Sequence, residues 1–205
     1  RQRQMCIRDR YNRDEIIRIA KIGFEYAQKR SSKLCCVDKA NVLETSRLWR
    51  ETVQSMEKNY PNIEVSYEFV DAVAMRLVQW PNSYDVLITS NLFGDILTDE
   101  ASVISGSMGL MPSASVGSEN ALYEPIHGSY PEAAGKNIAN PIASILSLSM
   151  MLDHSFNLKK ESEIINNAVE ESLKNKYVTP DLSSDKNSFS TDQVGDYIVD
   201  FIKKN

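Results

Sequence analysis

Short apolar runs alternate with amphipathic segments through the first half of the chain. Three runs have the length and composition of strands, at residues 33–37 (KLCCV), 63–70 (IEVSYEFV) and 84–90 (YDVLITS). Four further segments space their apolar residues as helices do, at residues 12–30, 44–60, 71–80 and 95–105. Strands that alternate with helices build a parallel sheet covered by helices. The order of these segments therefore predicts an α/β fold.

The second half of the chain has a different composition. Residues 106–140 are rich in Gly, Ser, Pro and Asn, and we expect a long loop region that is ordered as a binding surface. Three helices are predicted after it, from Asn140-Pro141 to about Asp153, over residues 159–176 and over residues 191–205. The change predicts one lobe over residues 11–105 and a second over 106–205. Residues 1–10 fit no periodicity and are predicted to be a disordered or foreign-looking arm.

Two residue pairs have the spacing of a capping box, in which a helix-starting residue and the third residue after it bond reciprocally. Asn12 and Glu15 stand at the start of the first predicted helix, and Ser190 and Gln193 at the start of the last. Both helices are therefore expected to begin at these pairs.

The charge and cysteine content exclude several classes of protein. The formal net charge is -5 with both signs interspersed, so no basic stripe indicates nucleic-acid binding. No apolar run is long enough to cross a bilayer, and no membrane partner is expected. Cys6, Cys35 and Cys36 make an odd count, and the adjacent pair has the setting of buried thiols. A reducing, cytoplasmic location fits this cysteine usage best.

Three aspartates follow predicted strands or begin predicted helices. Asp95 and Asp99 are four residues apart on one helical face, and Asp71 begins another helix after a neighbouring strand. Ligands of parallel sheets bind beyond the carboxyl ends of the strands, and three carboxylates there would suit Mg²⁺ or Mn²⁺. The competing interpretation is that Asp71 and Asp95 are helix caps and that Asp99 is solvated.

Lys39, Tyr11 and His127 each allow two interpretations. Lys39 follows a strand end, where a lysine with a lowered pKa acts as a general base, although most lysines lie on the surface. Tyr11 is either a proton donor or a packing residue. His127 lies in a glycine-containing loop that a ligand can approach closely, and alone it fits a hydrogen-bonded loop residue best.

Several long segments together resemble one family. VDKANVLE with WR, YEFVDAVAMRLV, NLFGDILTDEASVISGSMGLMPSASVG and YEPIHGSYPEAAGKNIANPIASILS resemble the metal-dependent β-hydroxyacid oxidative decarboxylases of the isocitrate/isopropylmalate dehydrogenase family, in the family's order from Tyr11 to Asn205. The resemblance implies that family's two-lobed α/β fold. The segment DKANVLE is more similar to isopropylmalate-type members than to isocitrate or homoisocitrate enzymes, which usually have His before that lysine.

The resemblance implies specific chemistry, the NAD-dependent oxidative decarboxylation of 3-isopropylmalate in leucine biosynthesis. Lys39 matches the lysine that assists removal of the substrate hydroxyl proton, and Tyr11 the tyrosine that protonates the enol after carbon dioxide leaves. Asp71, Asp95 and Asp99 match the aspartates that bind Mg²⁺ or Mn²⁺. In the family Lys39 and Asp71 come from the second subunit, so the resemblance implies a homodimer with shared active sites.

The resemblance also implies an NAD site in the second lobe, with Asn41 near the nicotinamide and His127 beside the adenosine. The positions that match the cofactor-binding residues are Asn41, His127, Gly128, Ser129, Glu132, Gly135 and Asn140. Many members have Asp where this chain has Glu132, at the position that would bind the adenosine ribose hydroxyls. Glu keeps the carboxylate, which would repel a 2′-phosphate, so NAD is expected in place of NADP.

Members of the family are longer at the amino terminus, where they carry the arginines that grip the substrate. We therefore expect this chain to be a C-terminal fragment that is inactive alone. Three alternatives remain: a homoisocitrate- or tartrate-type dehydrogenase, a non-catalytic regulatory subunit of the same fold, and a simple metal- or nucleotide-binding α/β domain. Tyr11, Lys39 and the three aspartates are all present, which favours an enzyme over a regulatory subunit.

Overall fold

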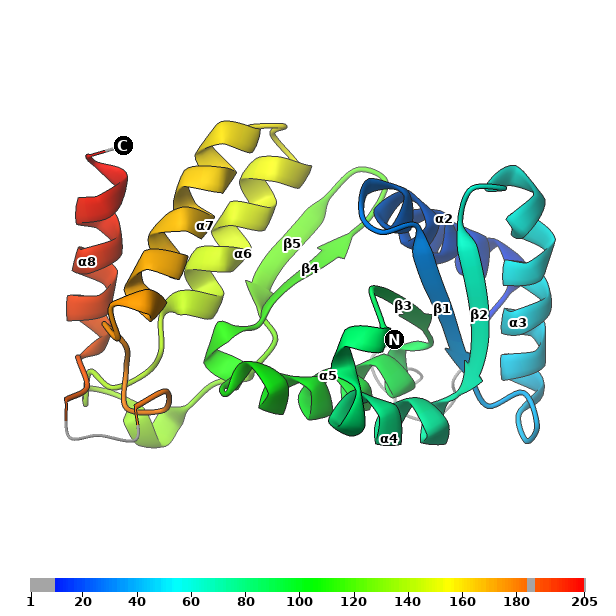
Figure 1. The fold of residues 1–205 in the computed structure, drawn as a ribbon, viewed down its shortest axis with the longest axis horizontal. Helices are drawn as coiled ribbons and strands as arrows, with labels where there is room; N and C mark the ends of the chain where they lie inside the picture. The colour runs from blue at the N-terminus through cyan, green and yellow to red at the C-terminus, as the bar shows by residue number, and fades with distance from the viewer. Residues whose placement is uncertain (1–9, 184–186, 205) are drawn as a thin grey trace. The chain divides into compact units, whose positions relative to one another are not determined.

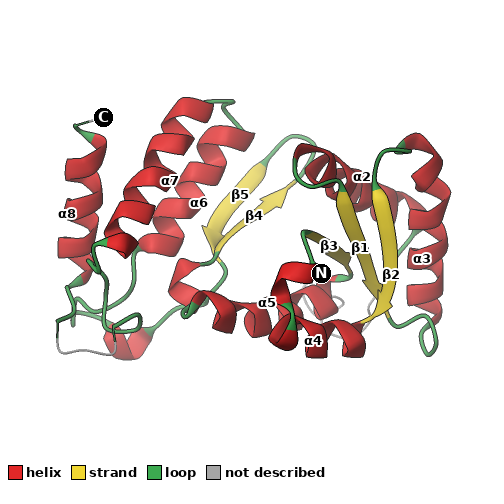
Figure 2. Ribbon diagram, in the orientation of Figure 1, coloured by secondary structure: helices red, strands yellow, loops and turns green. Residues whose placement is uncertain are grey.

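The computed structural model describes residues 10–183 and 187–204 (Figures 1 and 2). The chain divides into two compact units, and the division falls between Ala101 and Ser102. Cys6 and nearly all of the predicted arm lie outside the described residues.

The first unit alternates helices and strands, which confirms the predicted α/β order. Its elements are α2 (Arg13–Lys29), β1 (Lys33–Asp38), α3 (Glu44–Met56), β2 (Glu64–Phe69), α4 (Val70–Gln79), β3 (Val86–Thr89) and the start of α5 (Asn91–Ser105). The capping box before α2 is confirmed, because Glu15 N donates to Asn12 Oδ1 and Asn12 N donates to Glu15 Oε2, both at 2.9 Å.

The three strands form a parallel sheet in the order β2-β1-β3, so β1 is the central strand. Its side chains alternate between the two faces of the sheet. Leu34 and Cys36 pack with α2 and α3, whereas Cys35 and Val37 pack with α4 and α5. A strand covered by helices on both faces needs apolar residues at every position. This burial explains why KLCCV is a continuous apolar run and not an alternating one.

Two helices begin earlier than the sequence predicts, and this changes the interpretation of two aspartates. The N-cap of α4 is Phe69, which makes Asp71 the second residue of the helix. α5 begins at Asn91, so Asp95 lies inside the helix. The interpretation of Asp71 and Asp95 as N-caps is therefore wrong. Continuous apolar residues ahead of each aspartate, Phe69-Val70 and Leu92-Phe93, hid the true starts.

The second unit contains a two-stranded antiparallel sheet and three long helices. Its elements are β4 (Pro112–Val116), β5 (Ala121–Pro125), α6 (Ile142–His154), α7 (Lys159–Lys174) and α8 (Thr191–Ile202). The helices share a core built on Ile142, Ala168, Val169, Val194 and Ile198.

The hairpin of β4 and β5 is a correction to the expected loop over residues 106–140. Pro112 pairs with Pro125 at one end, and β4 alternates only small side chains, from Ser113 to Ser115. Proline and alanine are depleted in strands, and β5 has no period of two, so sequence reasoning missed both strands. Pairing within the hairpin and contact with α6 order them instead.

The helices of the second unit start where the sequence predicts with one shift, although α7 and α8 end two to three residues earlier than predicted. α6 begins at Ile142, one residue later than Pro141 at the first helical position would give, and Asn140 Oδ1 accepts a 3.0 Å hydrogen bond from Ile142 N. At α8, Ser190 N donates to Gln193 Oε1 at 3.0 Å, which confirms that pair. Across the described part of the chain, no helix combines the length and apolarity needed to cross a membrane.

Candidate active site

The carboxyl ends of the three parallel strands carry the polar residues of the candidate site. Lys39 follows β1, and Asp71 stands in the first turn of α4, directly after β2. Lys39 Nζ donates a 2.6 Å hydrogen bond to Asp71 Oδ1. The Lys39 side chain is 24% exposed and that of Asp71 is 65% exposed, so the pair remains open to a ligand. The hydrogen bond from Lys39 holds the pKa of the Asp71 carboxyl below its usual value.

The turn that carries Lys39 is fixed by a buried carboxylate. Asp38 is 2% exposed and accepts two hydrogen bonds from Arg50 of α3, from Nε at 2.7 Å and from Nη2 at 3.1 Å. Asp38 Oδ1 also accepts from Ala40 N at 2.8 Å, and Lys39 N donates to Ser46 Oγ at 3.1 Å. The turn is therefore bonded on both sides of Lys39.

An aromatic ring lies beside the two cations of this turn. Lys39 Nζ is 5.6 Å from the ring centroid of Phe69, and Arg50 Cζ is 5.2 Å from the same centroid. Arg50 Cζ is also 5.5 Å from the centroid of Tyr67. Cations at these distances over aromatic rings are attracted to the ring face. The end of β2 thus limits where both side chains can move.

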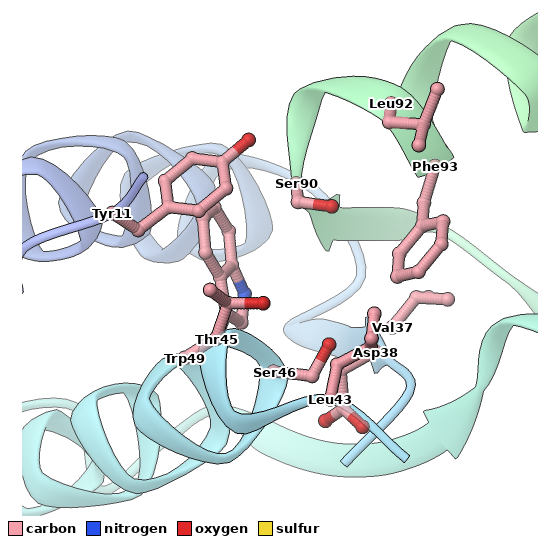
Figure 3. Close-up of a pocket in the computed structure, with 10 residues that line it drawn as sticks. All are labelled: Tyr11, Val37, Asp38, Leu43, Thr45, Ser46, Trp49, Ser90, Leu92 and Phe93. Carbon is pink, nitrogen blue, oxygen red and sulfur yellow. The ribbon is translucent and has the colours of Figure 1, made fainter. Parts of the chain in front are cut away.

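Tyr11 lines a small cavity in the first unit (Figure 3). Its hydroxyl accepts a 3.0 Å hydrogen bond from Asn91 N at the start of α5. Its ring meets Trp49 edge to face, with ring centroids 5.3 Å apart. The cavity of about 50 Å³ is also lined by Asp38, Ser46 and Ser90. Tyr11 is thus both a packing residue and a hydroxyl at the carboxyl end of the sheet.

Asp95 and Asp99 stand one turn apart on α5, and both are exposed. Among residues 10–183 and 187–204, no group of three or more His, Cys, Asp or Glu side chains is arranged to hold a metal. One copy of the chain therefore does not bring Asp71 together with Asp95 and Asp99. Carboxylate oxygens are the donors that Mg²⁺ and Mn²⁺ prefer, so the two α5 side chains fit part of such a site and need a further ligand from elsewhere.

The predicted cofactor residues are divided between the units. Asn41 lies in the turn after β1, whereas the other six lie in the second unit. His127 and Asn140 line a cavity of about 180 Å³ together with Tyr130 and Ile138. Gly135, with φ of +74°, lines a neighbouring hollow with Asn137. Gly128, Ser129 and Glu132 are exposed and do not line the 180 Å³ cavity.

Asp181 lines that cavity and is hydrogen-bonded to three other side chains. Its carboxylate accepts hydrogen bonds from Asn140 Nδ2 at 3.0 Å, from Thr179 Oγ1 at 2.6 Å and from Ser107 Oγ. Burial raises the pKa of Asp181, but these three hydrogen bonds outweigh it and the net pKa is lowered. Both ends of the Asn140 side-chain amide are thereby occupied, one by Asp181 and one by Ile142 N.

Comparison with known proteins identifies the family. A family model described as isocitrate/isopropylmalate dehydrogenase matches residues 2–198. The chain belongs to this family. Its long segment resemblances, from the β1 turn to the start of α6, all fall inside the matched range.

Two curated relatives share one name. The chain is 55% identical over 176 residues to a 3-isopropylmalate dehydrogenase of Aquifex aeolicus (strain VF5), a match that covers 86% of this chain and 48% of that protein. It is 51% identical over 195 residues to a 3-isopropylmalate dehydrogenase of Buchnera aphidicola subsp. Diuraphis noxia, covering 95% and 54%. The chain spans about half the length of the curated relatives that it matches.

Solved structures show the same fold. The crystal structure of isocitrate dehydrogenase from Methylococcus capsulatus matches with a TM-score of 0.91 at 39% identity, over 96% of this chain and 58% of that chain. The predicted isocitrate/isopropylmalate dehydrogenase-like α/β fold is confirmed by this match.

Sequence reasoning missed two residues of the site. Arg50 enters the sequence analysis only within the WR segment of the family resemblance, without a role of its own, and Asp181 is not singled out. The only sequence signal for Arg50 is a buried-strand carboxylate, Asp38, that requires a partner. Asp181 has no comparable signal, because its hydrogen-bond partners Ser107, Asn140 and Thr179 are far apart in the sequence and common residue types.

Proposed function

We propose that the chain contributes to the NAD⁺-dependent oxidative decarboxylation of 3-isopropylmalate to 2-oxoisocaproate in leucine biosynthesis. The observation that carries this proposal is the Lys39–Asp71 hydrogen bond of 2.6 Å at the carboxyl ends of the strands, in a chain more than half identical to proteins with that name. Lys39, with its side chain 24% exposed, takes the proton of the substrate hydroxyl as hydride leaves the same carbon. After carbon dioxide is lost, the Tyr11 hydroxyl returns a proton to the enol carbon.

The cofactors are part of the proposal. Asp71, Asp95 and Asp99 would hold Mg²⁺ or Mn²⁺, and the loop from His127 to Asn140 with Asn41 would hold NAD. When bound, the metal polarises the substrate oxygens as a Lewis acid and NAD⁺ accepts the hydride. The cavity lined by His127 and Asn140 supports the cofactor assignment of these two residues. Glu132 lies in a short turn within that loop, where its carboxylate would disfavour a 2′-phosphate.

The exposed faces of two helices support the proposal of a homodimer with shared active sites. On α4, Met75 and Val78 are 62% and 68% exposed, and they share one face with Asp71. On α5, Leu92 and Ile96 are 56% and 55% exposed, and they share a face with Asp95 and Asp99. Exposed apolar side chains in such numbers are typical of an interface. A second copy that covers both faces would bring the three aspartates together.

A complementation experiment tests the shared site. Lys39→Met and Asp95→Asn variants of the complete gene product are each expected to be inactive. If each site takes Lys39 from one subunit and Asp95 from the other, random mixing restores about a quarter of wild-type activity, because half of the dimers then hold one intact site. No recovery after mixing, from proteins shown to exchange subunits, would exclude shared sites.

The activity itself is tested by NADH formation. The complete gene product is assayed with 3-isopropylmalate, isocitrate, homoisocitrate and tartrate, with Mn²⁺ and then with EDTA. We expect the protein to oxidise 3-isopropylmalate selectively, and we expect EDTA to abolish this activity. A preference for homoisocitrate or tartrate would change the proposed substrate. A folded dimer without any activity would favour a regulatory subunit over an enzyme. A cytoplasmic location is also proposed, since Cys35 and Cys36 are buried free thiols.

A further inference from the structure

The end of β1 holds a buried ion pair that the proposed chemistry does not use. Asp38 is 2% exposed, and Arg50, with its side chain 26% exposed, binds both of its carboxylate oxygens. A charge buried to this extent is tolerated only when it is paired and hydrogen-bonded. Asp38 is the residue immediately before Lys39, so the position of this carboxylate determines where the chain leaves the strand.

Each contact of the pair restrains the path of Lys39. Asp38 Oδ1 accepts from both Arg50 Nη2 and Ala40 N, so the residue before Lys39 binds the residue after it. The planar guanidinium binds the carboxylate bidentately, which fixes angle as well as distance. Arg50 also lies against Phe69, the ring whose centroid is 5.6 Å from Lys39 Nζ.

We propose that the Asp38–Arg50 pair is a positioning device for Lys39. The guanidinium holds Asp38 and Phe69, and these two in turn hold the backbone and the ammonium group of Lys39. Arg50 touches no reacting atom in this arrangement and is a positioning residue, not a catalytic one. This inference rests on the proposed function, because it assumes that Lys39 takes the substrate proton. A side chain displaced by about 1 Å costs an enzyme on the order of 100-fold in rate.

The chain offers a matched control at the opposite end of the same sheet. Arg30 Nε donates to Asp85 Oδ1 at 2.6 Å, beside the amino ends of β1 and β3. This pair joins the same two residue types in the same unit, but it contacts neither Lys39 nor Phe69. A general loss of stability would lower kcat when either pair is broken. Displacement of Lys39 would lower kcat only when the Asp38–Arg50 pair is broken.

The test compares Arg50→Met with Arg30→Met in the complete gene product. We expect Arg50→Met to lower kcat by at least about 10-fold with KM changed less than about 3-fold, since proton removal and not ground-state binding is impaired. Millimolar guanidinium is expected to restore part of that kcat, and Arg50→Lys to keep part of it. Arg30→Met is expected to leave kcat unchanged. Equal losses of kcat in both variants would overturn the proposal.

A second readout does not depend on activity. Hydrogen exchange of residues 38–43 reports the turn directly, because Ala40 N bonds to Asp38 and both Val42 N and Leu43 N bond to Lys39 O. Exchange there should accelerate in Arg50→Met and stay unchanged in Arg30→Met. If Arg50→Met fails to fold, Asp38→Asn combined with Arg50→Met removes both charges and still lacks the restraint. Unchanged exchange in these variants would overturn the proposal, even if the protein proved to have no dehydrogenase activity.

Discussion

Lys39 and Asp71 are 32 residues apart in the sequence and are joined by a 2.6 Å hydrogen bond from Nζ to Oδ1. The parallel sheet produces this pair, because β1 and β2 end side by side, with Asp38 opposite Phe69 in the register. One strand delivers a cation and its neighbour delivers a carboxylate. The pair is open to solvent, so it adds little to the stability of the fold.

This exposure gives the first prediction. Lys39→Met should leave the melting temperature of the complete gene product nearly unchanged while it lowers kcat by about 100-fold or more, the range of positioned acid–base groups. Calorimetry and NADH formation measure the two effects separately. A variant that unfolds at a much lower temperature would show that Lys39 is structural.

Asp95 and Asp99 should show stability and activity that change in opposite directions. Like charges four residues apart on a helix repel, so Asp95→Asn should raise stability by about 0.2–0.5 kcal/mol when unfolding is measured in EDTA. The same variant should lose more than about 100-fold in activity with Mn²⁺, since groups that only support metal ligands already contribute 10–100-fold. A variant that is more stable and fully active would remove Asp95 from the metal site.

Two glycines of the second unit form a matched pair for measurements of stability. A Cβ at Gly109 would lie 2.6 Å from Asn140 Cβ, and the Asn140 amide is held at both ends. Gly109→Ala should therefore destabilise by about 1–3 kcal/mol through overpacking. Gly195 lies within α8 and a Cβ there meets nothing within 4 Å. Gly195→Ala should stabilise by about 0.5–1 kcal/mol in urea unfolding.

Acid sensitivity of the first unit should depend on Asp85. Hydrogen bonds from Ser31 and Arg30 lower the pKa of Asp85 to about 2. A carboxyl whose folded pKa is depressed contributes stability that is fully present above its unfolded pKa of about 3.9 and is lost as pH falls toward the folded value. The stability gap between wild type and Asp85→Asn should be widest above about pH 4 and should close toward pH 2. A gap that does not change with pH would contradict this linkage.

The two thiols of β1 should resist modification. Burial raises the pKa of Cys35 to about 11 and raises that of Cys36 further. Since the thiolate is the reactive form, both should react with a disulfide reagent at pH 8 far more slowly than an exposed thiol. The measurement uses a Cys6→Ser background. Unfolding in urea should make both thiols react at the same time. Fast labelling of the folded protein would show that β1 opens locally.

Much of the first unit follows from local sequence patterns. The run KLCCV and the spacing around Ile16, Ala20 and Phe24 identify a buried strand and an amphipathic helix, because burial on two faces or on one face leaves different periods. The capping boxes at Asn12 and Ser190 also act over a few residues. Such features depend on neighbours in the sequence, and sequence reasoning recovers them.

The parts that sequence reasoning missed depend on distant partners. Arg50 acquires its role from Asp38, which is 12 residues away, and from Phe69 on another strand. The strands β4 and β5 are stabilised by each other and by α6 in spite of their proline and serine content. The aspartates of the metal site remain a prediction, since one copy of the chain gathers no group of three among its described residues.

The central place of β1 has a consequence for synthesis of the protein. Both strands that pair with it, Glu64–Phe69 and Val86–Thr89, leave the ribosome after it. Until Thr89 has emerged, at least one edge of β1 is unpaired, and Leu34 to Val37 carry no charge that would discourage pairing with another nascent chain. Translation that slows between Phe69 and Val86 would prolong this state, so the codons of that interval bear on the yield of folded protein.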